Sequence, residues 1–209
     1  MSEFENQTFS RVAVAAGETR EEAVRNALML VRKDILAKVK GHVMVKPNFL
    51  SSVTYLASTQ AAAVRPVLEL LREAETDSVI IAEGGSRSTR QAFERFGYHE
   101  LARDFDVELV DLNHRGFSRS FRLVTETRGS HDIAYSDCAA EADTIISVAV
   151  AKTHDAAAVT LSLKNMMGCL RRVQRQRMHG IQLGMFAEEI GEYLWNVIED
   201  HDQRTSGKR

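Results

Sequence analysis

The sequence contains few cysteines: Cys138 and Cys169 are the two among 209 residues. Two cysteines cannot build a disulfide framework, and they cannot supply the four thiolates that hold an iron–sulfur cluster. We therefore expect reduced thiols in a reducing compartment and no iron–sulfur cluster. The identity of any other cofactor stays open.

Long apolar segments are also missing. No stretch approaches the roughly 18 apolar residues that a membrane span requires. The first residues, 1–9, are polar and acidic and do not resemble a signal peptide. These absences predict a cytoplasmic protein without a membrane partner.

Charge of one sign is not in excess, because the formal net charge is -2. The chain as a whole therefore does not attract nucleic acids or anionic membranes, and any basic site must be local. The 2 prolines and 12 glycines punctuate the chain sparsely, and no linker or repeat is present. We expect a single α/β domain over residues 1–200, followed by a flexible polar tail, 201–209.

Short β-rich runs alternate with segments of helical spacing. The expected strands cover 11–15, 42–45, 78–82, 107–111 and 144–150, with an extra hairpin that includes 121–125. The expected helices cover 19–39, 59–75, 88–97, 156–177 and 185–200. Thr19 and Glu22 form a capping box, and Gly97 is a C-terminal stop. Pro66 either starts or kinks the second helix.

This alternation predicts an α/β fold. The expected architecture is a three-layer sandwich with a mostly parallel, doubly wound, Rossmann-like sheet. Right-handed crossovers place the carboxyl ends of the strands along one edge, where ligands of such sheets bind. Candidate site residues are therefore sought directly after each strand.

Two of these positions have polar or glycine-rich turns. Lys46 and Asn48 follow the second expected strand, where a lysine offers a point charge and an asparagine offers a donor and an acceptor. Gly84, Gly85 and Ser86 follow the third, where glycine lets the backbone approach a ligand and a helix N-terminus presents free amides. A solvated turn lysine and an ordinary strand-to-helix turn are the alternative interpretations.

The densest polar cluster follows the last expected strand. Lys152 and His154 lie at its end, and a histidine there can act as acid or base near neutral pH. If the next segment is helical, Thr160, Lys164 and Gly168 share one face. A lysine in a partly apolar site can have a lowered pKa and act as a base or nucleophile. A solvated loop and an exposed helix face are equally compatible with this pattern.

An arginine-rich run, 171–177, follows, and we expect one or two of its members, Arg172 among them, to face the cleft. We do not expect nucleic-acid binding, because the run has no interleaved aromatic residues. We expect no metal site either. His154, Asp155, His179 and Cys138 lack the spacing of a metal-ligating motif.

Four stretches together resemble the family known as domain of unknown function 362. They are VMVKPNFL (43–50), STQAAAVRPVLELL (58–71), IIAEGGS (80–86) and KTHDAAAVTLSLKNMMG (152–168), with His179 as a later match. Asn165 belongs to the last and most specific stretch. The chain departs from the family's Thr-Thr-His-Pro pattern, because it has Ser58-Thr59-Gln60-Ala61 and so lacks that histidine.

The resemblance implies no particular reaction, since members largely lack an assigned activity. Some are fused to ferredoxin-like modules, for which this chain lacks the cysteines. Members usually continue past the end of this chain, which leaves three interpretations open: a short form, a truncated chain that lacks part of the cleft, or a homodimer in which a second subunit completes the cleft.

The leading hypothesis is a protein with an anion-binding cleft, acting as an enzyme on a small phosphate- or carboxylate-bearing metabolite. Catalysis would fall to His154, Lys164 and Asn165. Ligand binding would fall to Lys46, Asn48, Gly84, Gly85, Ser86, Lys152, Thr160, Arg172 and His179. The alternative is a non-catalytic ligand-binding or regulatory module, and the sequence leaves open whether any reaction occurs.

Overall fold

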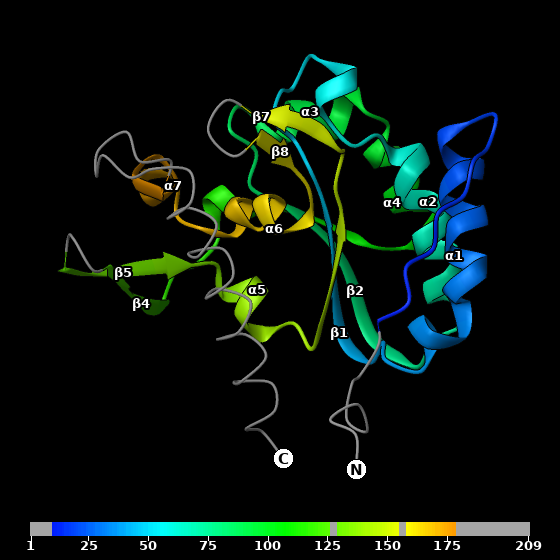
Figure 1. Ribbon diagram of the computed structural model, residues 1–209, viewed down its shortest axis with the longest axis horizontal. Coiled ribbons are helices and arrows are strands. Elements are labelled where there is room, and N and C mark those ends of the chain that lie inside the picture. Colours follow the sequence, from blue (N-terminus) through cyan, green and yellow to red (C-terminus); the bar gives the residue numbers. More distant parts are fainter. Residues whose placement is uncertain (1–9, 126–128, 155–157, 179–209) are drawn as a thin grey trace, which may run out of the picture.

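The computed structural model describes residues 10–125, 129–154 and 158–178. Its centre is a four-stranded parallel sheet in the order β3-β2-β1-β6 (Figure 1). The strands are β1 (Gly41–Pro47), β2 (Thr76–Glu83), β3 (Glu108–Asp111) and β6 (Thr144–Val148). The parallel α/β sheet and four of the five expected strands are confirmed.

Helices cover both faces of the sheet, and the expected sandwich is confirmed (Figure 1). On one face lie α1 (Arg20–Leu36), α2 (Ala61–Leu71) and α4 (Tyr98–Phe105). On the other lie α5 (Asp137–Glu141), α6 (Ser162–Asn165) and the 3-10 helix η3 (Met166–Cys169). The remaining helices are α3 (Thr89–Arg95), α7 (Arg172–Met178), η1 (Tyr55–Ala57) and η2 (Leu112–His114).

Strand β1 divides the core because its side chains alternate between the two faces. Val43 and Val45 pack in the cluster that includes Val64 of α2 and Leu101 of α4. Met44 packs in the second cluster, with residues of α5 and η3. Because of the same alternation, the side chain of Lys46 points to the same face of the sheet as Met44, which is the face that α6 and η3 cover.

Local signals account for two helix ends. The Thr19 hydroxyl accepts a hydrogen bond from the Glu22 amide at 3.1 Å, and the Glu22 carboxylate accepts one from the Glu18 amide at 2.8 Å. Gly97 has φ 84 and separates α3 from α4, a conformation that costs glycine little. Pro66 lies inside α2, five residues after its first residue, and does not start it.

Residues 11–15 are not a strand, so this prediction was wrong. Val12 and Val14 are 85% and 86% exposed, and no described strand pairs with them. A β-rich run without burial lacks the packing that stabilises a strand. The expected hairpin is confirmed as β4 (Arg119–Thr125) paired with β5 (Gly129–Tyr135).

The prediction of a single helix over 156–177 was also wrong. The chain forms a small hairpin of β7 (Lys152–His154) and β8 (Ala158–Thr160), and then α6, η3 and α7 in turn. Leu161 is extended, with φ -138 and ψ -156, so Thr160 and Lys164 do not share a helical face. The expected helix 185–200 lies outside the described residues. No helix in the described ranges is both long and apolar enough to cross a bilayer.

Candidate functional site

Lys46 lies near the carboxyl end of β1 and is fully buried. Its ammonium donates hydrogen bonds to the Glu83 carboxylate, to the Pro47 carbonyl at 3.2 Å and to Asn165 Oδ1 at 3.2 Å. A buried ammonium needs such partners because desolvation of an unpaired charge is costly. Lys46 is therefore an internal charge, and its donors are directed at protein atoms.

Glu83 ends the neighbouring strand β2 and is also buried. Burial raises the pKa of Glu83 above its ordinary value, and the attraction of Lys46 opposes that rise. The Phe49 amide also donates to this carboxylate. The two central strands of the sheet are thus joined at their carboxyl ends by an ion pair within the protein.

Asn165 joins this pair to the helical layer. Its amide donates to the Lys46 carbonyl at 3.2 Å and to the Ser147 hydroxyl at 2.9 Å, so α6 is tied to both β1 and β6. Gly168 completes the contact. A Cβ there would lie 2.6 Å from Lys46 Nζ and 3.0 Å from a Glu83 carboxylate oxygen. Glycine is therefore needed for η3 to approach the ion pair closely.

The glycine-rich turn after β2 uses its polar groups within the protein. The Gly85 amide donates to Thr89 Oγ1 at 3.0 Å, and the Ser86 amide donates to the Phe49 carbonyl at 3.4 Å. The Ser86 hydroxyl donates to the Leu50 carbonyl. A Cβ on Gly84 would lie 2.3 Å from the Gly168 carbonyl oxygen. This turn packs against η3, and the amides of Gly85 and Ser86 are not free for a ligand.

Arg175 of α7 binds the other side of the same turn. Its guanidinium donates to the Gly84 carbonyl, to the Leu170 carbonyl at 2.7 Å and to Asn113 Oδ1 at 2.6 Å. Burial lowers the pKa of Arg175, and Glu83 opposes that shift. The arginine that reaches inward is therefore Arg175, whereas Arg172 is exposed. Nothing in the spacing of the arginine run distinguishes these two positions.

The β7–β8 hairpin carries the open part of the site. Lys152 Nζ donates to Asn48 Oδ1 and, at 3.2 Å, to the Val150 carbonyl, so the hairpin is joined to the turn after β1. Lys152 pairs directly with Thr160 across the hairpin. Side chains of directly opposed residues project to the same face. Thr160 is 5% exposed, and its hydroxyl has no hydrogen-bond partner among the described residues.

Lys164 of α6 adds a second cation to this region. Burial first, and then the nearby charge of Lys152, together lower the pKa of Lys164 to about 8. Burial also lowers the pKa of Lys152. Both lysines are partly buried. The hairpin and α6 thus bring two ammonium groups close enough to repel each other in a partly desolvated environment.

Two of the expected site residues are described in part or not at all. The backbone of His154 ends β7, but its side chain lies outside the described atoms, and His179 lies outside the described residues. Within the described ranges, no three side chains of the metal-ligating types gather into a cluster.

The sequence analysis did not identify Glu83, Asn113 and Arg175 as site residues, because their positions in the site depend on contacts between distant parts of the chain.

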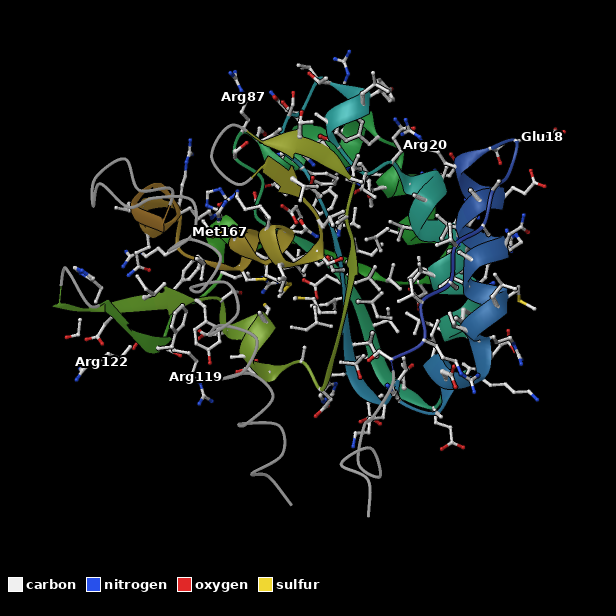
Figure 2. The ribbon with its side chains drawn as sticks, viewed as in Figure 1. Glu18, Arg20, Arg87, Arg119, Arg122 and Met167 are labelled. Atoms are coloured by element: carbon white, nitrogen blue, oxygen red, sulfur yellow. The ribbon has the colours of Figure 1, made fainter. Side chains whose placement is uncertain are left out.

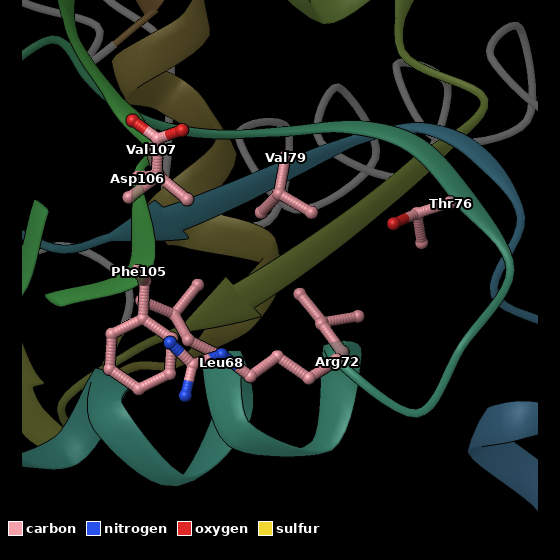
Figure 3. Close-up of a pocket in the computed structure, with 8 residues that line it drawn as sticks. Leu68, Arg72, Thr76, Val79, Phe105, Asp106 and Val107 are labelled. Carbon is pink, nitrogen blue, oxygen red and sulfur yellow. The ribbon is translucent and has the colours of Figure 1, made fainter.

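A hollow of about 170 Å³ lies at the opposite edge of the sheet (Figure 3). It is lined by Leu68 of α2, Val79 of β2 and Phe105 of α4 among others. The Arg72 guanidinium covers the Phe105 ring at 4.2 Å from its centre. Thr76, which begins β2, also lines this hollow, so it lies near the amino end of β2. The hollow is therefore separate from the lysine-rich edge.

Residues 43–200 match the family model described as "Domain of unknown function (DUF362)". The chain is also similar to the thylakoid-associated protein sll1697 of Synechocystis sp., with 26% identity over 154 residues. That alignment covers 73% of this chain and 46% of the relative, so the chain spans about half the length of that protein. The matched family region contains the carboxyl edge of the sheet and each of the candidate site residues.

Proposed function

The chain belongs to the DUF362 family, and from that premise we propose that it binds a small phosphate- or carboxylate-bearing molecule at the carboxyl edge of its sheet. The ligand would lie between Lys152 and Lys164, with the Thr160 hydroxyl as a hydrogen-bond donor. The observation that carries the proposal is the buried Thr160 hydroxyl, without a partner in the described chain, on the hairpin face that it shares with Lys152.

Electrostatics supports the same position. Desolvation and repulsion from the charge of Lys152 both disfavour the ammonium form of Lys164 in the free protein. An anion between the two lysines would replace that repulsion by attraction and would accept the hydrogen bond that Thr160 can donate. Charge-assisted hydrogen bonds of this kind are the strong ones in ligand recognition.

The buried residues Lys46, Glu83 and Asn165 would then support the site from inside the protein. The ion pair of Lys46 and Glu83, with Asn165, fixes α6 against the ends of β1 and β6. This arrangement would hold Lys164 at a constant distance from the hairpin. Lys46 and Asn165 therefore contribute by positioning in this proposal, whereas Asn48 contributes by orienting Lys152.

Catalysis is a second candidate, favoured by the pKa of Lys164, which at about 8 is near the pH at which a general base works well. In this version the bound anion is a substrate and Lys164 takes a proton from it. A thermal-shift screen of anionic metabolites, paired with product analysis for each stabilising compound, separates the two candidates. Stabilisation without a product favours a binding module.

Calorimetric titration with inorganic phosphate tests the binding proposal. We expect Lys152→Met and Lys164→Met each to weaken binding by about tenfold or more, because each removes one charge-assisted contact. Lys33→Met is the matched control, since Lys33 is an exposed lysine on α1. Unchanged affinity in both site variants would contradict the proposal.

A further inference from the structure

Three segments of the chain meet at the carboxyl edge of the sheet, and we call their described residues the rim. The segment after β1 contributes 48–60, the segment after β2 contributes 84–91, and the segment after β6 contributes 152–154 and 158–164. They follow β1, β2 and β6, which are neighbours in the sheet. The Ser86 hydroxyl binds the Leu50 carbonyl, and Lys152 binds Asn48, so the three segments are joined to one another. They lie together at the top of Figure 1.

The rim exposes large apolar side chains. Seven of its large apolar side chains are exposed, and Leu56, at 77%, is the most exposed of them: Leu50, Val53, Tyr55, Leu56, Val159, Leu161 and Leu163. Single exposed apolar residues are ordinary, but a group on adjoining loops marks an interaction surface. The loop that follows β1 is held in place, since the Tyr55 hydroxyl donates a hydrogen bond to the Arg95 carbonyl at 3.2 Å.

Strand alternation separates this surface from the proposed anion site. In β8, Thr160 is buried and faces the same way as Lys152, whereas Val159 is 52% exposed and lies on the opposite face. Leu161 continues the exposed side at 50%. The outer face of the hairpin is therefore apolar, and its inner face carries the polar groups.

Charge on the rim has one sign. The chain has 29 acidic residues in all, yet rim residues 48–60, 84–91, 152–154 and 158–164 include no Asp or Glu. Arg87 and Arg90 are exposed, and Figure 2 shows Arg87 extending outward at the top of the molecule. Asp155, between the hairpin strands, lies outside the described residues. The net charge of -2 thus conceals a local surface that is both cationic and apolar.

We propose that the rim binds the surface of an anionic lipid bilayer. Aliphatic side chains at the tips of loops can enter the boundary between headgroups and acyl chains, and a tyrosine is well suited to that boundary. Arginines beside them are attracted to the anionic headgroups. The apolar side chains are presented by separate loops, which suits a deformable lipid surface better than a fixed protein surface. This interaction uses residues other than Lys152, Thr160 and Lys164, so it does not depend on the proposed anion site.

Vesicle flotation of the full chain tests the proposal. One set of vesicles contains equal parts of phosphatidylglycerol and phosphatidylcholine, and the other contains phosphatidylcholine alone. We expect flotation with the first set only, and a loss of binding on addition of salt, because the attraction is partly electrostatic. Leu56→Ser combined with Leu161→Ser should lower the bound fraction by at least about tenfold.

Matched variants on α1 serve as controls. Met29 and Leu30 are 60% and 64% exposed, and Met29→Ser combined with Leu30→Ser should leave flotation unchanged. Arg87→Gln should weaken binding by about fivefold, whereas Lys33→Gln should not. The proposal is overturned by absence of flotation with anionic vesicles, by an equal effect of the α1 variants, or by binding to a DNA duplex with no binding to vesicles.

Discussion

Lys46 and Glu83 form an ion pair that is almost completely removed from solvent, with side-chain exposures of 0% and 3%. The pair connects the carboxyl ends of the two central strands of the sheet, and α6 and η3 cover it. The energetic role of such a pair is asymmetric. Removal of one partner leaves an uncompensated buried charge, whereas removal of both can cost little.

We therefore predict that Lys46→Met destabilises the chain strongly, by about 3–5 kcal/mol. The double variant Lys46→Met with Glu83→Gln should recover a large part of that loss. Urea unfolding of both variants, with exposed Lys40→Met as a control expected to lie within about 0.5 kcal/mol of the parent, measures the difference. A double variant as unstable as the single one would show that the pair contributes more than charge compensation.

Gly168→Ala should also be destabilising, by about 1–3 kcal/mol, because the added methyl group would meet the buried ion pair. Its Cβ would lie 2.6 Å from Lys46 Nζ. Gly85→Ala is the milder comparison and should cost less than Gly168→Ala, since the nearest atom to its Cβ, the Phe49 carbonyl oxygen, would be 3.3 Å away. Thermal unfolding in which both variants lose the same stability would argue against close packing of η3 on the pair.

Arg175→Lys should destabilise the chain by about 1–3 kcal/mol. A lysine lacks the planar fork that reaches the Gly84 carbonyl, the Leu170 carbonyl and Asn113 together. Arg172→Lys, on the exposed side of α7, should change the free energy of unfolding little. Equal effects of the two substitutions would remove the special role assigned to Arg175.

Lys164→Met should raise stability near neutral pH by about 1 kcal/mol after allowance for solvent screening, although it weakens anion binding. The reason is that burial disfavours the ammonium, which lowers the pKa of Lys164 from 10.5 to about 8. Between these two values the unfolded chain binds more protons than the folded chain. The stability of the parent relative to Lys164→Met should therefore rise with pH across this window. Parallel curves of stability against pH for the two proteins over the same window would contradict a lowered pKa of Lys164.

Local signals in the sequence predicted much of the fold. Val43–Val45 and Ile81–Ala82 are β-rich and buried, and Ser88 and Gly97 mark the ends of α3 by chemistry that acts within a few residues. Residues 11–15 carry the same apolar signal but have no described partner strand, so propensity alone predicted a strand there. Segment 156–177 has helical spacing, yet its described residues begin with strand β8, and the helical part is broken at Leu161 and again after η3.

The candidate site could be predicted less completely. Its location at the carboxyl edge follows from the order of strands and helices, and Asn48 and Lys152 are brought together there. The burial of Lys46 could not be predicted, because its partner Glu83 lies 37 residues away and the sequence does not encode that pairing locally. The inward position of Arg175, rather than Arg172, could not be predicted for the same reason. It depends on how α7 packs against a turn 91 residues earlier.

The most direct test of the anion site is the pKa of Lys164 itself, measured by NMR on lysine-labelled protein, with Lys164→Met to assign the signal. We expect a value of about 8 in the free chain and a clear rise when inorganic phosphate saturates the protein. A Lys164 pKa near the ordinary lysine value, or one that saturating phosphate leaves unchanged, would contradict this expectation.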